Sequence, residues 1–393
     1  MTTVAAMEPL LPDDQKELED LATDLVAKAN GLAGRLNPVM RASVGDVVRS
    51  MNCYYSNLIE GHNTFPIDID RALKDELAPE PERRNLQLEA RAHIDVQRMI
   101  DRGEAPTPVT AVEFITWTHR NFCERLPDEM LWVENPETKE RLKVVPGKLR
   151  DRQVKVGRHV PPAPDELDAF LKRFVEGYSS PHLSRLRKVI GVAASHHRLA
   201  WIHPFLDGNG RVTRLFSHAL LRELDVGSEL WSVSRGLARR VNEYKSNLQA
   251  ADEPRHGDLD GRGNLTMKGL VDFCRFFLTA SVDQVDFMGS LLEPAELLRR
   301  MEIWTEEETR AKRVLKGSWP LLREAVIAGE FSRGKAAELT GYETRQARTV
   351  LNTLIDLGYL ASPTPKSPVR LGFPAEVVDR WFPRLYQPPG GNY

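Results

Sequence analysis

The residues between His203 and Arg214 carry the side chains of this chain that are best suited to chemistry on a nucleotide. The segment reads His-Pro-Phe-Leu-Asp-Gly-Asn-Gly-Arg-Val-Thr-Arg. An imidazole such as His203 titrates near neutral pH and can take a proton from an attacking hydroxyl. Asp207 offers a hard oxygen ligand of the kind that Mg²⁺ prefers. Arg211 and Arg214, one helical turn apart, can clamp the outer phosphates of a triphosphate and neutralise charge on the leaving group.

The elements around these side chains are predicted to be two helices that meet at a glycine-rich turn. Apolar residues at helical spacing predict a helix that ends at His203. Gly208 and Gly210 allow the backbone of a tight turn and expose peptide N–H groups around Asn209. A second helix over residues 211–224 would point its N-terminus at the turn, where unpaired N–H groups and the helix dipole favour an anion. We expect a polyphosphate there, although an isolated Asp-Gly-Asn-Gly also fits an ordinary loop.

The pattern His-x-Phe-x-Asp-Gly-Asn-Gly-Arg-x-x-Arg resembles the signature of the Fic family, whose members mostly transfer AMP from ATP to hydroxyl side chains of target proteins. The resemblance implies ATP as co-substrate, Mg²⁺ as cofactor and a target protein that presents a Ser, Thr or Tyr hydroxyl. It makes His203 the catalytic base and Asp207 the metal ligand. The residues that it assigns to phosphate and nucleotide binding are Gly208, Asn209, Gly210, Arg211, Arg214 and Tyr244.

Residues 146–162 extend the resemblance on the N-terminal side of the signature. The run Pro-Gly-x-x-Arg, followed by Val-x-Val-Gly and two prolines, is similar to the family's flap, a β-hairpin that holds the target segment by main-chain pairing. The alternation of Val154 and Val156 between turn residues predicts a short strand here.

The helix that contains Tyr244 resembles the wall of the family's adenine pocket, with two departures. Many relatives carry a second aromatic residue in place of Lys245, and an amide is common in place of Asp252. Two other functions remain open from the residues alone. One, left open by these two departures, is an enzyme that uses UTP, CTP or a phosphocholine carrier. The other is a DNA-binding regulator whose core senses nucleotide or modifies only itself, although the intact His203 argues against a core without activity.

The hexapeptide Ser56-Asn57-Leu58-Ile59-Glu60-Gly61 resembles the inhibitory motif of the family, S/T-x-x-x-E-G/N, carried on a helix over the nucleotide site. A glutamate at that place would pair with Arg214 and occupy the space that a γ-phosphate needs. The resemblance makes Ser56 and Glu60 regulatory residues and implies a protein that is inactive by default. Taken alone, the hexapeptide also fits a helix end with a glycine cap.

The C-terminal part of the chain differs from the rest in charge. Residues 311–393 carry a net charge of +5, against −7 for the first 310 residues. A short helix ending at Gly341, a second helix from Thr344 and a proline-interrupted loop resemble a winged helix-turn-helix. Arg345 and Arg348 would then lie on the exposed face of the second helix and contact DNA phosphates. A docking or dimerisation domain is the alternative, because +5 is modest for a DNA-binding protein.

We expect a mainly α-helical fold. Its parts are an N-terminal helical segment with the inhibitory motif (1–99), a Fic-type core with a β-hairpin flap (100–290), a charged helical linker (291–315) and a winged helix-turn-helix domain (316–393). The absence of a run of about 18 apolar residues argues against a membrane span. Three scattered cysteines and an N-terminus without a secretory pattern lead us to expect a cytoplasmic protein. A homodimer is left open.

Overall fold

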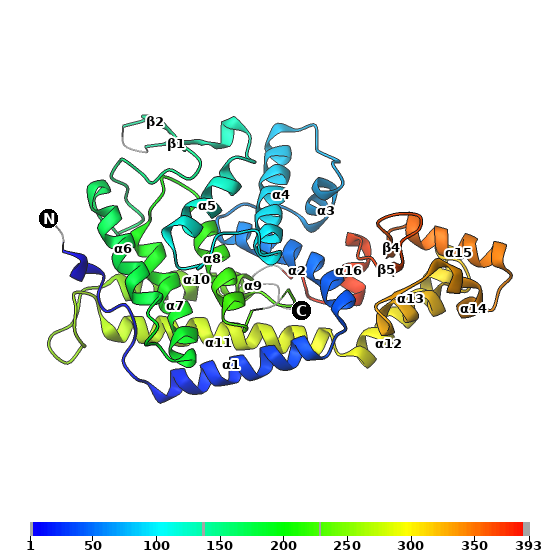
Figure 1. Ribbon diagram of the computed structural model, residues 1–393. Helices are drawn as coiled ribbons and strands as arrows, with labels where there is room; N and C mark the ends of the chain where they lie inside the picture. Colours follow the sequence, from blue (N-terminus) through cyan, green and yellow to red (C-terminus); the bar gives the residue numbers. More distant parts are fainter. Residues whose placement is uncertain (1–2, 136–137, 228, 388–393) are drawn as a thin grey trace.

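The computed structural model describes residues 3–135, 138–227 and 229–387, and most of these residues lie in helices (Figure 1). The helices of the larger part are α1 (Lys16–Gly34), α2 (Pro38–Ile59), α3 (Pro66–Leu73), α4 (Pro81–Asp101), α5 (Val112–Cys123), α6 (Leu167–Tyr178), α7 (Arg185–Ile202), α8 (Asn209–Glu223), α9 (Val233–Arg239), α10 (Val241–Asp252), α11 (Met267–Leu291) and α12 (Pro294–Arg310). Short 3₁₀ turns are η1 (Val4–Met7), η2 (Asp128–Met130), η3 (Pro164–Glu166) and η4 (Arg333–Lys335). The C-terminal helices are α13 (Ser318–Ile327), α14 (Ala336–Thr340), α15 (Thr344–Asp356) and α16 (Ala375–Trp381). The strands are β1 (Trp132–Glu134), β2 (Arg141–Lys143), β3 (Glu330–Phe331), β4 (Leu360–Ala361) and β5 (Val369–Leu371).

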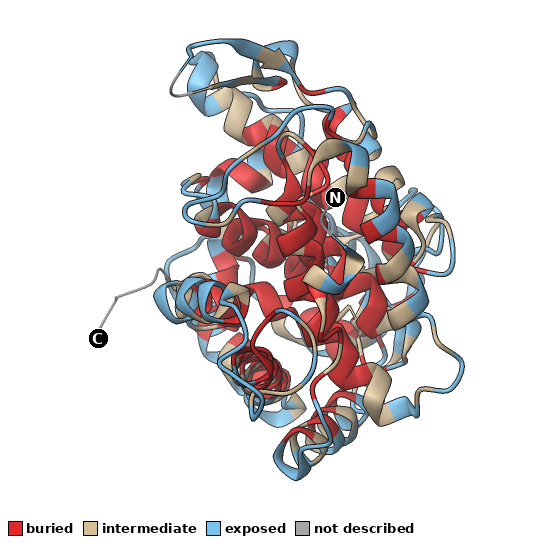
Figure 2. Ribbon diagram, turned by 90° about the vertical axis from the view of Figure 1, so that its left-hand side faces the viewer, coloured by how far each residue is buried: buried red, intermediate tan, exposed pale blue. Residues whose placement is uncertain are grey.

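Helix α7 runs through the centre of the larger part, which Figure 2 shows as a continuous buried core. Every residue from Val189 to Leu199 is buried, as expected for a helix covered on all sides. Its neighbours are α8, α6 and α11, and α1 lies along α11 at the base of the molecule in Figure 1. The buried polar side chains of α7 therefore need hydrogen-bond partners inside the protein, and they help to build the site described below.

The N-terminal helices α2 and α4 cover the face of the core where α8 begins. Helix α2 starts with Pro38 in its first turn, and the Asn37 side chain accepts the N–H of Met40 (2.8 Å). It ends at Ile59, and Gly61, two residues later, has a φ of +84° that suits a glycine following the end of a helix. Because α2 packs on α4 and α9, and α4 packs on α8, the end of α2 is held beside the start of α8.

The C-terminal helices and strands form the extension on the right of Figure 1. Three antiparallel strands in the order β3-β5-β4 lie beside α13 and α15, and α14 packs on both of these helices. The predicted second helix is confirmed as α15, which begins at Thr344 and buries one stripe: Ala347, Val350, Leu351 and Leu354. Helix α12 packs on α13 and α16, while α16 and β5 also contact α3 and α2, respectively.

The prediction of a short strand at residues 154–156 is wrong. A single antiparallel bridge joins Val156 to His159 across Gly157, whose φ is +60°. Pro161 and Pro162 lack the N–H groups that a longer ladder would need. The hairpin in this region is instead β1–β2, which pairs residues 132–134 with 141–143. Within the described ranges, no helix is long and apolar enough to span a membrane.

Candidate active site

The signature segment joins two helices as predicted. Helix α7 ends at His203, which adopts a left-handed conformation with φ of +50°, and its N–H bonds the carbonyl of Leu199 (3.1 Å). Helix α8 begins at Asn209, and its N-cap Gly208 has φ of +78°. Two sharp reversals of the backbone thus place the side chain of His203 and the first turn of α8 at the two ends of one short loop.

Asn209 closes this loop with its side chain. Its Oδ1 accepts the N–H of Phe205 (2.9 Å), and its Nδ2 donates to the carbonyl of Phe205 (2.8 Å). The first intrahelical bond of α8 runs from Val212 N–H to Gly208 (3.0 Å), which leaves the preceding N–H groups without a partner in the helix. Asn209 can therefore offer its backbone N–H to an anion, while its side chain keeps the loop in shape.

Arg150 ties the predicted flap to the signature loop, a role that sequence reasoning missed. Its Nε donates to the carbonyl of His203 (2.8 Å), and its Nη2 donates to the carbonyl of Pro162 (2.5 Å). Its backbone N–H bonds the carbonyl of Pro204 (2.9 Å). Burial of the guanidinium lowers the pKa of Arg150 to about 10 by desolvation. Its place in the Pro-Gly-x-x-Arg run was the one available signal.

Burial also sets the protonation of His203. Desolvation lowers the pKa of His203 to about 4, so its imidazole is neutral at neutral pH. A neutral imidazole has a free lone pair and can accept a proton, which is what a general base requires.

His119 on α5 supports the same loop from behind and was also missed from the sequence. Its ring stacks on Phe205 with centroids 3.9 Å apart, and its Nδ1 accepts the N–H of Gly147 (2.9 Å). Burial lowers the pKa of His119 to about 4, which agrees with a neutral ring that accepts at Nδ1. His119 therefore links the signature loop to the start of the predicted flap.

The predicted inhibitory residues lie on Arg214. Its Nε donates to Ser56 Oγ (2.8 Å), and its Nη2 bonds Glu60 Oε1 (2.5 Å). The Glu60 carboxylate lies against the backbone of Gly210, where even a methyl group would collide with Oε1. Although burial opposes its charge, Arg214 and Arg211 hold the pKa of Glu60 below its ordinary value. A carboxylate thus occupies the N-terminal end of α8, the position that favours an anion.

Arg211 has a different carboxylate partner. It forms an ion pair with the buried Glu89 of α4, and Glu89 also bonds His62. These three residues, together with Asp207 and Gly208, are among those that line a cavity of about 220 Å³. Each motif arginine is therefore paired with a glutamate from a different N-terminal helix.

Residues 110–221 match the Fic/DOC family. This segment is a Fic domain. A protein adenylyltransferase Fic from Nematostella vectensis is 28% identical over 169 residues, which cover 43% of this chain and 36% of that protein. A protein of the same name from Drosophila erecta is 45% identical over 75 residues, 19% of this chain and 15% of the relative. Both matches thus span well under half the length of the relatives.

A solved structure extends the likeness beyond the Fic domain. A Fic family protein from Desulfovibrio desulfuricans G20 aligns with 89% of this chain and 95% of its own, with a TM-score of 0.51 and 18% identity. At that identity the match shows a shared fold. The mainly helical architecture predicted from the sequence is confirmed.

Tyr244 lies inside the protein beside the Fic domain, in a chain of polar groups. Its hydroxyl bonds His196 Nε2 (2.7 Å), and His196 Nδ1 bonds Ser217 Oγ (2.8 Å), which itself donates to the carbonyl of Thr213 (3.0 Å). Ser217 must therefore accept from His196 Nδ1, so Nε2 accepts from the tyrosine. Burial lowers the pKa of His196 to about 3, in agreement with a neutral ring. Asp252, which stands where many Fic proteins have an amide, bonds the buried His197 (3.1 Å).

Arg345 and Arg348 are not brought to this site. Both are exposed on α15 in the C-terminal extension (Figure 1). Gln346, Thr349 and Asn352 are exposed on the same helix, opposite its buried stripe. The chain thus presents a second polar surface that is separate from the Fic domain.

Proposed function

We propose that this protein is a protein adenylyltransferase that moves AMP from ATP to a Ser, Thr or Tyr hydroxyl of a target protein or of itself. The observation that carries the proposal is the N-terminus of α8, where free N–H groups and two arginines converge beside a neutral histidine. Matches to proteins named adenylyltransferases support the same reaction class.

In this mechanism the N–H groups of the first turn of α8 and the two arginines hold the phosphates. His203 takes the proton as the hydroxyl oxygen of the target bonds the α-phosphorus, and the bond from that phosphorus to the bridging oxygen breaks. Pyrophosphate leaves with its charge neutralised by Arg211 and Arg214. Arg150 fixes the position of His203 relative to the flap segment, because its Nε donates to the backbone carbonyl of His203.

Asp207 is the residue that would hold Mg²⁺. Among the described residues, no group of three His, Cys, Asp or Glu side chains could bind a metal on its own. The exposed carboxylate of Asp207 nevertheless fits Mg²⁺, which commonly takes one or two carboxylates and completes its shell with waters and substrate phosphates. When bound, the ion would neutralise charge on the phosphates during transfer.

Inhibition by Glu60 is part of the proposal. Its carboxylate pairs with Arg214 and fills the anion position beside Gly210, so a triphosphate cannot settle there while Glu60 stays. Shifting the site from 1:99 to 99:1 in favour of the competent state over the blocked state needs a free-energy difference of about 5.5 kcal/mol. This is more than the ~1 kcal/mol that an exposed ion pair contributes. The Glu60 side chain is 30% exposed and Arg214 is 2% exposed, so steric exclusion and partial burial act together with the charge.

The test uses the full chain with each labelled nucleoside triphosphate. We expect Glu60→Gly to label itself or a target strongly with ATP, wild type to label weakly, and Glu60→Gly combined with His203→Ala to label at least ~10²-fold less than Glu60→Gly. Arg214→Ala should not mimic activation, because it removes a group that binds phosphate. Equal labelling by wild type and Glu60→Gly would refute inhibition by Glu60. Labelling only by UTP or CTP would refute ATP as the donor.

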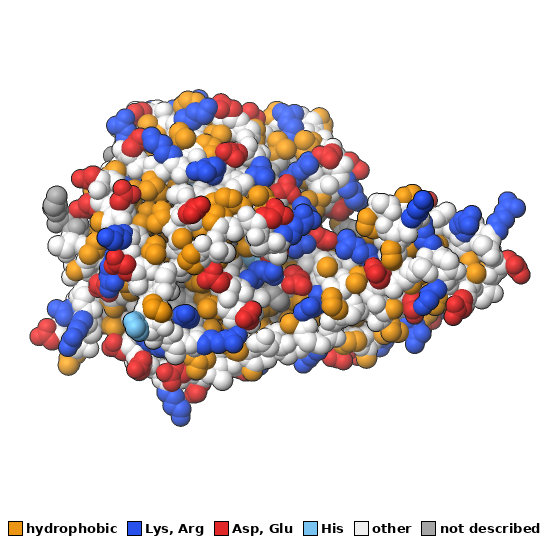
Figure 3. All heavy atoms as spheres, in the orientation of Figure 1, with side chains coloured by type: hydrophobic (Ala, Val, Ile, Leu, Met, Phe, Trp, Pro, Cys, Tyr) orange, Lys and Arg blue, Asp and Glu red, His pale blue; other side chains and the backbone are white. Residues whose placement is uncertain are grey.

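We also propose that α15 binds duplex DNA. Its exposed face combines Arg345 and Arg348 with amide and hydroxyl side chains, the groups that bond phosphates and base edges. Within the described part of the chain, neither arginine forms an ion pair that would compete with a phosphate. Figure 3 shows Lys and Arg side chains projecting at the right-hand end of the molecule, where these helices lie.

The DNA test is a mobility-shift titration of the full chain at several salt concentrations. Two phosphate contacts contribute about −1.8 to the slope of log affinity against log salt, so Arg345→Ala plus Arg348→Ala should flatten the slope by about that amount. Arg299→Ala plus Arg310→Ala, which changes two exposed arginines of α12, is the matched control. No retardation of DNA by wild type would favour docking of a protein partner instead.

A further inference from the structure

Glu89 is a buried carboxylate attached directly to a signature arginine. It lies in the middle of α4, its side chain is 2% exposed, and one oxygen forms an ion pair with Arg211. Its other oxygen bonds His62 Nδ1 at 2.7 Å. Both oxygens of Glu89 are thus used, one by the phosphate clamp and one by a histidine that follows the inhibitory motif directly.

The position of His62 follows from the end of α2. After Gly61 turns the chain, the N–H of His62 bonds the carbonyl of Asn57 (2.9 Å), and this brings the ring back over the start of α8. Its side chain is 39% exposed, and its Nδ1 lies 3.0 Å from Arg211 Nη2. The hydrogen bond to Glu89 raises the pKa of His62 above its ordinary value, which favours a charged ring.

The two glutamates of the site differ in their freedom to move. Glu60 caps the end of α2, and 30% of its side chain is exposed. Glu89 is buried within a long helix between two cationic groups, and its departure would leave Arg211 buried without a counterion. Glu89 is therefore less free than Glu60 to leave its arginine.

Arg211 retains donors for a ligand in spite of this partner. Its Nε is buried and makes no hydrogen bond to the described residues, and its guanidinium carbon lies 5.5 Å from the centre of the Phe122 ring. The aromatic ring and Glu89 thus fix the plane of the guanidinium at the wall of the cavity that Asp207 and Gly208 also line.

We infer that Glu89 is a positioning residue for Arg211, and that His62 supplies the positive charge that lets a polyphosphate approach in spite of Glu89. This inference rests on the proposed function, because it assigns Arg211 to the phosphates. The inference predicts opposite changes in polyphosphate affinity when the negative charge of Glu89 or the positive charge of His62 is removed. Removing the anion Glu89 should tighten polyphosphate binding but release Arg211, which lowers turnover. Removing the cation His62 should weaken binding.

The experiment uses Glu60→Gly as the parent, so that the anion position is free. Into this parent we introduce Glu89→Gln, which keeps the shape of the side chain, or His62→Ala. Calorimetric titration with inorganic tripolyphosphate and with ATP measures affinity, and labelled ATP measures kcat and KM. We expect Glu89→Gln to bind severalfold more tightly with kcat about tenfold lower, and His62→Ala to bind severalfold more weakly.

The matched control is Asp68→Asn, which removes another buried carboxylate of the N-terminal helices that is paired with an arginine, Arg83. It does not line the cavity and should leave affinity and kcat within twofold. If Glu89→Gln fails to fold, the weaker binding of His62→Ala still decides the question. Affinity within twofold of the parent in His62→Ala, or kcat within twofold of the parent in Glu89→Gln, would overturn the inference.

The experiments distinguish failure of the proposed transfer reaction from failure of the inference about Glu89 and His62. If Glu60→Gly transferred no label from any nucleotide, the proposed reaction would be wrong. The tripolyphosphate titrations do not depend on transfer, and opposite shifts in the two variants would still establish the charge balance around Arg211.

Discussion

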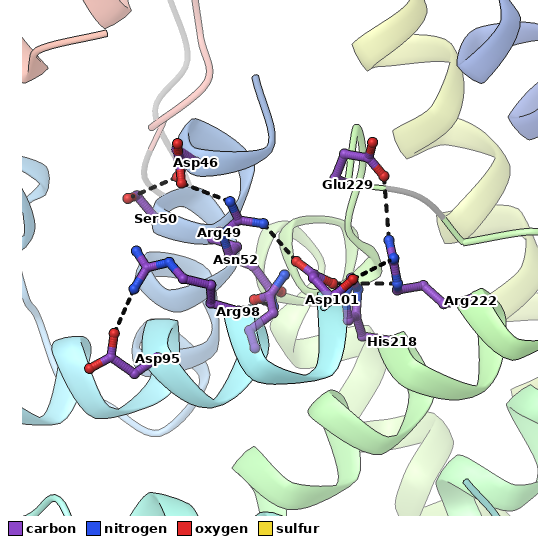
Figure 4. Close-up of polar contacts among 11 residues, drawn as sticks. Asp46, Arg49, Ser50, Asn52, Asp95, Arg98, Asp101, His218, Arg222 and Glu229 are labelled. Atoms are coloured by element: carbon purple, nitrogen blue, oxygen red, sulfur yellow. Dashed lines mark hydrogen bonds and ion pairs between the residues drawn. The ribbon is translucent and has the colours of Figure 1, made fainter. Parts of the chain in front are cut away.

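Asp101, the last residue of α4, holds the N-terminal helices onto α8, and its removal is expected to destabilise the protein in a pH-dependent way. Figure 4 shows its carboxylate between Arg49 of α2 and two side chains of α8. It bonds Arg49 Nη1 (2.8 Å) and His218 Nε2 (2.8 Å), and Arg222 Nε lies 3.5 Å away. Only 7% of the Asp101 side chain is exposed, so these contacts act at low dielectric.

The size of the expected loss of stability follows from the lowered pKa of Asp101. Although burial opposes the charge, His218, Arg222 and Arg49 lower the pKa of Asp101 from 3.8 to about 2. A shift of nearly two units corresponds to about 2.5 kcal/mol of stabilisation at neutral pH. Because the folded pKa is depressed, this stabilisation is complete above the unfolded pKa near 4 and disappears as the pH falls through about 2. Roughly half of it should remain at pH 3.

Urea denaturation of wild type and Asp101→Asn at pH 7, 4 and 3 measures this effect. The difference in free energy of unfolding should be about 2.5 kcal/mol at pH 7 and about half that at pH 3. Asp46→Asn is the control, because Asp46 bonds the same Arg49 (2.7 Å) but its side chain is 49% exposed, and it should cost ~1 kcal/mol or less. A difference below ~1 kcal/mol at pH 7, or one that does not change with pH, would refute the reasoning.

Three further changes test the site and its supports. In the Glu60→Gly background, His203→Ala should leave ATP affinity within about twofold by calorimetry. Because the pKa of His203 is about 4, the kcat of transfer by Glu60→Gly alone, measured at saturating ATP, should stay level from about pH 8 to pH 5 and fall below that, and a fall centred near pH 6.5 would contradict the assignment. Arg150→Ala removes the donor to the His203 carbonyl, so transfer should fall about tenfold with ATP affinity kept, and a loss of affinity instead would place Arg150 on the nucleotide. Tyr55→Phe removes the hydroxyl that donates to the carbonyl of Leu385 (2.9 Å), so stability should fall by ~1 kcal/mol and amides near Leu385 should exchange faster; unchanged exchange would show that this bond does not hold the C-terminal segment.

Local signals in the sequence determined the helices and turns that carry the signature. Apolar spacing placed the end of a helix at His203, and Gly208 marked the turn before α8, because periodicity and backbone freedom are properties of a few neighbouring residues. Gly210, predicted to lie in the turn, is instead in the first turn of α8, which begins at Asn209 and not at Arg211. The start of α15 at Thr344 was equally readable from its apolar stripe. The strand over 154–156 was misread, because alternation predicts exposure and does not provide a pairing partner.

The prediction that Glu60 lies beside Arg214 came from a family resemblance, since no local signal links residues that are 154 positions apart. The sequence by itself determined which chemistry the signature can support and, to within two residues, the ends of the helices that meet there. Only the tertiary structure decided that Glu89 would pair with Arg211, and that Arg150 and His119 would support the loop of the base. These partners lie on separate elements, and a buried charge or ring acquires its partner and its pKa from whatever the packing of distant helices brings within a few ångströms.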